Sequence, residues 1–62
     1  MTDFTTQQKL QAINREIVFR MRVFERRVLA QRMTQRKAEY EIAIMQAIGQ
    51  DYEHQLARER LL

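Results

Sequence analysis

The chain has 62 residues, of which 45% are hydrophobic and 31% are charged, and its formal net charge is +3. It contains no cysteine, no proline and a single glycine, which excludes disulfides, cysteine-based metal sites and most turn-rich β architectures. A chain this short buries only about 60% of its unfolded surface, so self-association is the expected source of additional stability.

The first predicted helix runs from about residue 6 to about residue 30. Its start is marked by Thr5-Thr6-Gln7-Gln8, which matches the capping-box pattern at a helix N-terminus. Six residues then recur at alternating spacings of four and three, which is typical of an amphipathic helix. This first stripe consists of Leu10, Asn14, Ile17, Met21, Phe24 and Val28.

The second predicted helix runs from about residue 35 to about residue 60, after a turn at about 31–34. Thr34 is the candidate N-cap of this helix. A second stripe repeats the spacings of the first, and it consists of Ala38, Ile42, Met45, Gly49, Tyr52 and Leu56. Folding the chain at residue 33 brings the stripes face to face, with Asn14 opposite Tyr52 and Ile17 opposite Gly49. The predicted fold is therefore all-α, a two-helix antiparallel hairpin that forms one domain over residues 1–62.

One alternative is a single uninterrupted helix in a long coiled coil. The heptad phase supports it, because residues 14, 21, 28, 35, 42, 49 and 56 are equivalent. The polar residues Gln31 and Gln35 interrupt the seam at the proposed turn, which favours the hairpin. Since no glycine follows the first helix, Gln31 or Arg32 is expected to adopt the left-handed conformation that ends many helices. A hairpin and an opened dimer with exchanged second helices should then lie close in energy.

A second apolar surface is predicted on one side of the hairpin. It gathers residues that lie off the two stripes, namely Ile13, Phe19, Val23, Tyr40, Ile44, Ala47 and Ile48. Monomers seldom expose an apolar surface of this size. We expect it to join two hairpins into a homodimeric four-helix bundle, and the alternative occupant is a host protein.

The charge is unevenly distributed along the chain. Residues 1–33 hold seven Lys or Arg against three Asp or Glu, whereas residues 34–62 hold four against five. Arg15, Arg22 and Arg26 form a basic stripe on the first helix, and Arg27 is expected to meet Glu41 across the hairpin. The stripe supports an alternative function, which is weak binding of nucleic acid without sequence preference.

Catalysis is not expected. The chain has no serine or cysteine nucleophile, its one histidine is His54, and no carboxylate occupies a stripe position where a dimetal site of a helical bundle needs one. No glycine-rich phosphate loop is present. The sequence therefore predicts no enzyme, no cofactor and no metal, and it offers no apolar run long enough to span a membrane.

The segments Arg22–Val28, Arg32–Thr34 and Glu41–Ile48 resemble a group of short, uncharacterised helical proteins that bacteriophages and prophages of Gram-negative bacteria encode. The resemblance covers about residues 9–62. These proteins often have glycine at the position of Gln31, and proline and tryptophan at those of Glu25 and Arg27. The resemblance implies a phage or prophage accessory protein in the cytoplasm of a bacterial host. By analogy, we expect it to act through protein–protein interaction, as an inhibitor or adaptor of a host factor.

Overall fold

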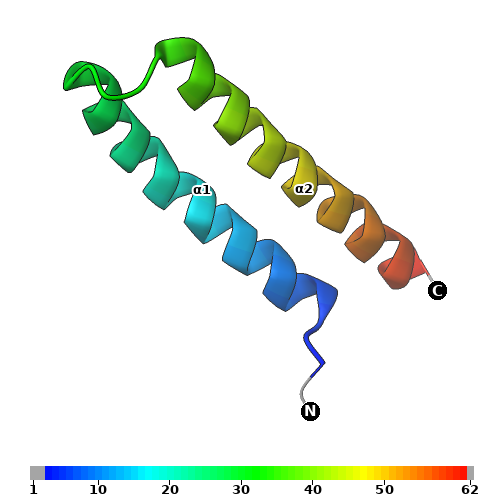
Figure 1. Cartoon of the computed structure of the whole chain (residues 1–62). Helices are drawn as coiled ribbons and strands as arrows, with labels where there is room; N and C mark the ends of the chain where they lie inside the picture. Colours follow the sequence, from blue (N-terminus) through cyan, green and yellow to red (C-terminus); the bar gives the residue numbers. More distant parts are fainter. Residues whose placement is uncertain (1–2, 62) are drawn as a thin grey trace.

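The computed structural model describes residues 3–61, which form two antiparallel helices side by side. Helix α1 spans Thr6–Leu29 and helix α2 spans Gln35–Leu61 (Figure 1). The prediction of an all-helical hairpin is confirmed, and the chain is not one continuous helix. The domain predicted over 1–62 also includes residues 1, 2 and 62, which lie outside the described residues.

Both helices begin at threonine caps that the sequence predicts. The hydroxyl of Thr5 accepts a hydrogen bond from the Gln8 backbone N–H at 3.1 Å, and the Gln8 side chain accepts one from the Thr5 N–H at 2.8 Å. This is a complete capping box, which satisfies two backbone donors at the start of α1. At the start of α2, the Thr34 hydroxyl accepts from the Lys37 N–H at 3.1 Å. Local side-chain chemistry therefore fixes where each helix starts.

Helix α1 ends in a left-handed residue at Gln31, whose φ is 59°. The Arg32 N–H donates to the Arg27 carbonyl at 2.8 Å, and the Gln31 N–H donates to the Val28 carbonyl at 3.0 Å. These two bonds are those of a Schellman motif, in which the residue after the C-cap is most often glycine. The expectation of a left-handed residue is thus confirmed at Gln31, at a cost of about 1–2 kcal/mol for a side chain in that conformation.

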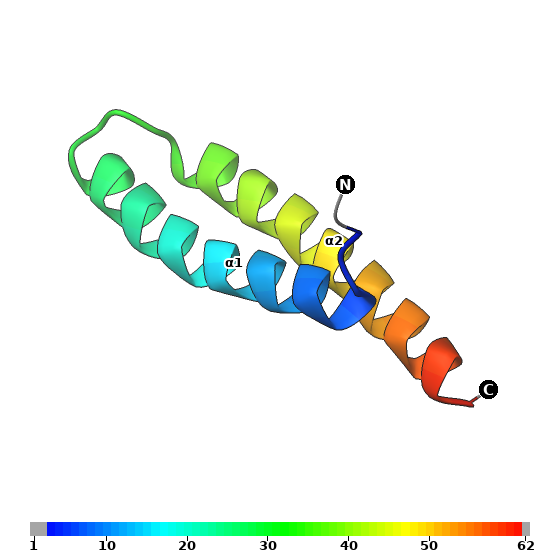
Figure 2. The ribbon, with the colours of Figure 1, turned by 90° about the horizontal axis from the view of Figure 1, so that it is seen from below.

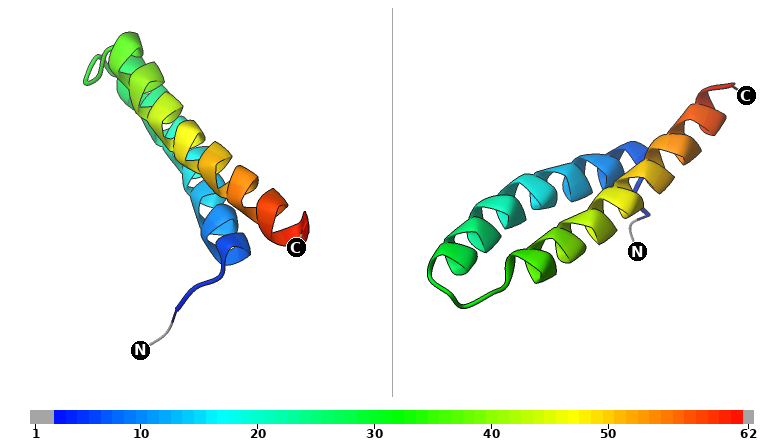
Figure 3. Two further views of the ribbon diagram at one scale, coloured as in Figure 1. Left: turned by 90° about the vertical axis from the view of Figure 1, so that its right-hand side faces the viewer. Right: turned by 90° about the horizontal axis from the view of Figure 1, so that it is seen from above.

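The two helices make a single layer with a thin core. The hairpin measures 48 × 23 × 15 Å, and in Figures 2 and 3 no other element covers either flank of the part described. Within residues 3–61, Phe24 and Ala38 are the only buried hydrophobic residues. Two helices alone cannot bury more side chains than this, because each helix is only about 10–12 Å wide with its side chains and contacts its neighbour along one face.

The face that α1 turns toward α2 differs from the predicted stripe. Asn14 and Met21 are exposed, whereas Thr6 is buried and Ile13 is half-buried. The contact line therefore follows Thr6, Leu10, Ile13, Ile17, Phe24 and Val28. Leu10, Ile17, Phe24 and Val28 belong to both lines, whereas Ile13 takes the place of Asn14, Thr6 is added at the start, and no residue replaces Met21.

The register at the open end is also corrected. A Cβ placed on Gly49 would lie 3.7 Å from the Asn14 Oδ1 atom and 3.7 Å from the Ile13 Cγ2 atom, so Gly49 packs against these residues and not against Ile17. No hydrogen bond joins Asn14 to Tyr52 within residues 3–61. The polar link between the helices is instead made by the Thr6 hydroxyl, which donates to the Glu59 carboxylate at 2.7 Å.

Candidate functional site

The strongest candidate site is an apolar surface on one flank of the hairpin, which we call the outer apolar flank. It is formed by Phe19, Val23, Tyr40, Ile44, Ala47 and Ile48. Among them, Tyr40 is 61% exposed, Phe19 59%, Ile44 42% and Ile48 39%, while Val23 is half-buried. These side chains remain in contact with solvent because α1 and α2 bury other faces against each other.

Helical spacing explains why this flank is continuous. Tyr40, Ile44 and Ile48 follow one another at intervals of four, so they form one row along α2. Phe19 and Val23 form a shorter row of the same kind on α1. By helical periodicity Val23, Ile44 and Ile48 lie on the same side of the line where the helices touch, and Phe19 and Tyr40 extend this surface around the back of each helix.

Ile13 does not belong to this surface as the structure places it. Its Cγ2 atom lies next to Gly49, and its side chain is half-buried in the contact between the helices. The sequence pattern cannot distinguish the two positions, because Ile13 stands at the edge between the seam and the flank. The other six predicted residues are those that define the outer apolar flank.

Charges at the border of the flank pair within each helix. Arg20 forms an ion pair with Glu16 on α1, and Lys37 forms one with Glu41 at 3.0 Å on α2. The Lys37 ammonium also lies 6.0 Å from the centre of the Tyr40 ring. The expected pairing of Arg27 with Glu41 is therefore replaced by a pairing within α2, which leaves the two helices without an ion pair between them in residues 3–61.

The basic stripe is exposed on the side of α1 that faces away from α2. Arg15, Arg22 and Arg26 are all exposed, and none of them forms an ion pair within residues 3–61. Arg15 and Arg26 are 11 residues apart, which corresponds to about 16 Å along the helix. The stripe is a row of three cations that are available to an anionic partner.

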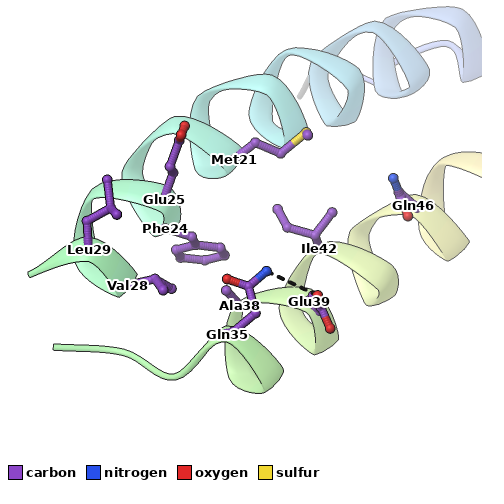
Figure 4. A pocket seen from close by; sticks show the side chains of 10 residues that line it. All are labelled: Met21, Phe24, Glu25, Val28, Leu29, Gln35, Ala38, Glu39, Ile42 and Gln46. Atoms are coloured by element: carbon purple, nitrogen blue, oxygen red, sulfur yellow. Dashed lines mark hydrogen bonds between the residues drawn. The ribbon is translucent and has the colours of Figure 1, made fainter. Parts of the chain in front are cut away.

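The opposite flank carries an open groove that the sequence analysis missed (Figure 4). Its volume is about 700 Å³, and its floor is formed by Phe24, Val28, Ala38 and Ile42. The wall on α1 consists of Met21, Glu25 and Leu29. The wall on α2 consists of Gln35, Glu39 and Gln46. The Gln35 amide donates to the Glu39 carboxylate at 3.1 Å, which is the dashed line in Figure 4.

A signal for the groove is present in the sequence. Leu29, which lines the groove, lies off the predicted stripe, on the side of α1 opposite to Phe19 and Val23, and Val18 lies on that side about three turns earlier, outside the groove. In the structure Leu29 is 77% exposed and Met21, a residue of the predicted stripe, is 51% exposed. Apolar residues on both sides of a stripe indicate that two flanks, and not one, are available for partners.

Within residues 3–61, no group of three His, Cys, Asp or Glu side chains could hold a metal ion. His54, the one histidine, is exposed on α2. In the same part of the chain, no helix combines the length and the apolar character that crossing a membrane requires.

Comparison with protein-family models, with curated proteins and with solved structures finds no match to this chain.

Proposed function

We propose that this hairpin is a non-enzymatic protein-interaction module that self-associates through the outer apolar flank into a four-helix bundle. The observation that carries the proposal is the contrast between a very thin core and a large exposed flank. Phe24 and Ala38 are the buried hydrophobic residues of the described chain, whereas four large side chains of the flank are 39–61% exposed. The resemblance to phage proteins supports a role as a cytoplasmic accessory protein that inhibits or links a host factor.

The energetics favour a second copy on this flank. Burial of a large apolar side chain is worth about 1.5–3 kcal/mol, and each hairpin would contribute several such side chains to a two-fold interface. A stability of a few kcal/mol is comparable to the whole free energy of unfolding of a small domain. Association would thus supply the stabilisation that the interhelix contact lacks.

The proposal is tested by the mass of the protein in solution, measured by light scattering at micromolar concentration. The wild type should be a dimer, and Ile44→Glu should shift it toward monomer because it places a carboxylate in the flank. Ala43→Glu is the matched control, since Ala43 is an exposed neighbour on α2 that lies outside the flank. A wild type that is a fully helical monomer, or an Ile44→Glu variant with an intact dimer, would refute the proposal.

A second function is favoured by the unpaired basic stripe of Arg15, Arg22 and Arg26. Three cations along about 16 Å of helix suit the phosphates of a nucleic acid, and they would give weak binding without sequence preference. Binding through three phosphates should weaken with salt at a logarithmic slope of about −2.7. Fluorescence anisotropy with a labelled generic duplex, measured at several salt concentrations, gives this slope.

The matched variants for this second function are two double charge reversals. Arg15→Glu with Arg22→Glu should abolish duplex binding and leave the helicity intact. Arg58→Glu with Arg60→Glu changes the net charge equally at the end of α2 and should retain most of the binding. Equal losses in the two variants would assign the binding to net charge and not to the stripe.

A further inference from the structure

We propose that the groove on the flank opposite to the outer apolar flank binds an amphipathic helix of a partner protein, with basic residues on both sides of its apolar stripe. The site is distinct from the self-association surface and goes beyond the function proposed above. Its lining, its length and its charge each restrict what can fill it.

The shape of the groove fits one helix. Its walls run along the two helices from Met21 to Leu29 and from Gln35 to Gln46, which corresponds to about 12–16 Å at 1.5 Å per residue. An occupant of two to three helical turns would cover this length. A third helix lying between α1 and α2 would cover Phe24, Val28 and Ile42 and complete a three-helix arrangement. The thioether of Met21 can adapt to the side chains of such an occupant.

The charge of the groove is opposite to that of the chain. The protein carries a net +3, yet the two charged residues that line the groove are both acidic, Glu25 on the α1 wall and Glu39 on the α2 wall (Figure 4). Neither carboxylate forms an ion pair within residues 3–61. A helix in the groove would therefore meet one carboxylate on each side of its apolar stripe, so lysine or arginine on both sides gives complementary charges.

A second copy of the chain is a poorer occupant. Helix α1 has a short apolar row with arginines nearby, but its large residues are only Phe19 and Val23, about 6 Å apart along the axis. That row covers less than half of the groove. Its insertion would also be a head-to-tail contact, which extends into fibres unless it closes into a ring. The row on α2 is bordered by the ion pair of Lys37 with Glu41 and by Asp51, so it does not present a cation on each side to face Glu25 and Glu39.

The test uses two fluorescent peptides of about 14 residues, which is long enough to span the groove. Both are amphipathic helices with the same leucine stripe, and they carry lysine or glutamate on both sides of it. Fluorescence anisotropy should show that the lysine peptide binds the wild type about tenfold more tightly, as two exposed ion pairs of about 0.7 kcal/mol each would give. The double variant Glu25→Lys with Glu39→Lys should reverse this preference.

Two controls make the result specific to the groove. Asp51→Lys with Glu53→Lys changes the net charge by the same amount on α2 away from the groove, and it should retain the preference for the lysine peptide. Leu29→Gln removes an exposed side chain from the groove wall and should weaken the binding of the lysine peptide several-fold with unchanged circular dichroism. Equal binding of the two peptides, no binding, or an effect of the control variant equal to that of the groove variant would overturn the proposal.

The mass in solution separates this proposal from the self-association proposal. The Glu25→Lys and Glu39→Lys variant should keep the oligomeric state of the wild type, because the groove lies on the other flank. If this variant instead loses its self-association, a second copy occupies the groove and the partner helix is refuted. If the wild type is monomeric yet binds the lysine peptide selectively, only the self-association proposal fails.

Discussion

The two ends of the hairpin are held together by different interactions. Near the turn, the contact between the helices buries one large apolar side chain, Phe24 on α1, and one small one, Ala38 on α2. Near the open end, Thr6 is buried and its hydroxyl donates to Glu59, and Gly49, a residue without a side chain, is buried at the middle of α2. Apolar burial therefore stabilises mainly the turn end, whereas the open end depends on a hydrogen bond and on half-buried side chains such as Leu10 and Leu56.

This difference teaches where a two-helix hairpin is weakest. Burial of an aromatic ring is worth several kcal/mol, whereas a single hydrogen bond contributes about 0.5–1.5 kcal/mol net. We therefore expect the open end to fray first and the turn end to carry the cooperative unit. The following substitutions test this asymmetry, and all unfolding should be measured at one protein concentration because association shifts apparent stability.

The largest expected effect is that of Phe24→Ala. Removal of the buried ring should lower the free energy of unfolding by about 3–5 kcal/mol, which is enough to unfold a hairpin this small. Urea unfolding followed by far-UV circular dichroism measures the loss. Leu56→Ala at the open end is the comparison, and its loss should be only about 1–2 kcal/mol because Leu56 is half-buried. Equal losses at the two positions would contradict the asymmetry.

Gly49→Ala should stabilise the protein by about 1 kcal/mol, because alanine is the better helix former. A Cβ at this position would lie 3.7 Å from each of its two nearest neighbours, Asn14 Oδ1 and Ile13 Cγ2, which is ordinary van der Waals contact. Thermal unfolding should therefore show a higher midpoint. Gly49→Leu adds atoms beyond the Cβ and should lower the midpoint instead. A destabilised alanine variant would mean that the open end requires a closer approach of the helices than the structure has.

Thr6→Val removes the hydroxyl at the open end and keeps the shape of the side chain. We expect a loss of about 0.5–1 kcal/mol, since the Glu59 carboxylate still accepts from the Gln55 amide at 3.3 Å. Hydrogen exchange of the amides in the first turns of α1 should accelerate, while exchange near Phe24 stays unchanged. Acceleration along the whole of α1 would show that the two ends unfold as one unit.

The smallest expected effect is that of Gln31→Gly, which relieves the left-handed residue after α1. Part of the 1–2 kcal/mol of strain is offset by the greater freedom of glycine in the unfolded chain, so we expect a net gain of about 0.5 kcal/mol. Gln50→Gly, inside α2, is the control and should cost about 1 kcal/mol. A stability of Gln31→Gly equal to or below that of the wild type would contradict the strain at the turn.

Labels at residues 9 and 58 test whether the turn opens. Within a hairpin these positions lie near each other, whereas one straight helix would separate them by about 74 Å. If some wild-type molecules show the long distance between the two labels, their fraction should be smaller in Gln31→Gly. A long distance alone in the wild type would refute the closed hairpin in solution.

The amino-acid sequence by itself determined the helices, their caps and the turn. The helix starts are set by hydrogen bonds of Thr5 with Gln8 and of Thr34 with Lys37, and the end of α1 is set by the left-handed dihedral angles of Gln31. These interactions lie within a few residues of one another, so they can be predicted without knowing where the other helix packs. The apolar rhythm of four and three likewise predicted that the two helices pack together.

Only the tertiary structure decided the rotation of α1 about its axis and the register at the open end. The stripe through Asn14 and Met21 and the contact line through Thr6 and Ile13 obey the same spacing, because the helical repeat of 3.6 residues drifts against any seam of threes and fours. The choice between them depends on what α2 places opposite, namely Gly49 beside Ile13 and Glu59 beside Thr6. That same rotation leaves Met21 and Leu29 on the rim of a groove. The apolar residue Leu29 beside the stripe is visible in the sequence, but the α2 wall that faces it is set only by the packing of the two helices.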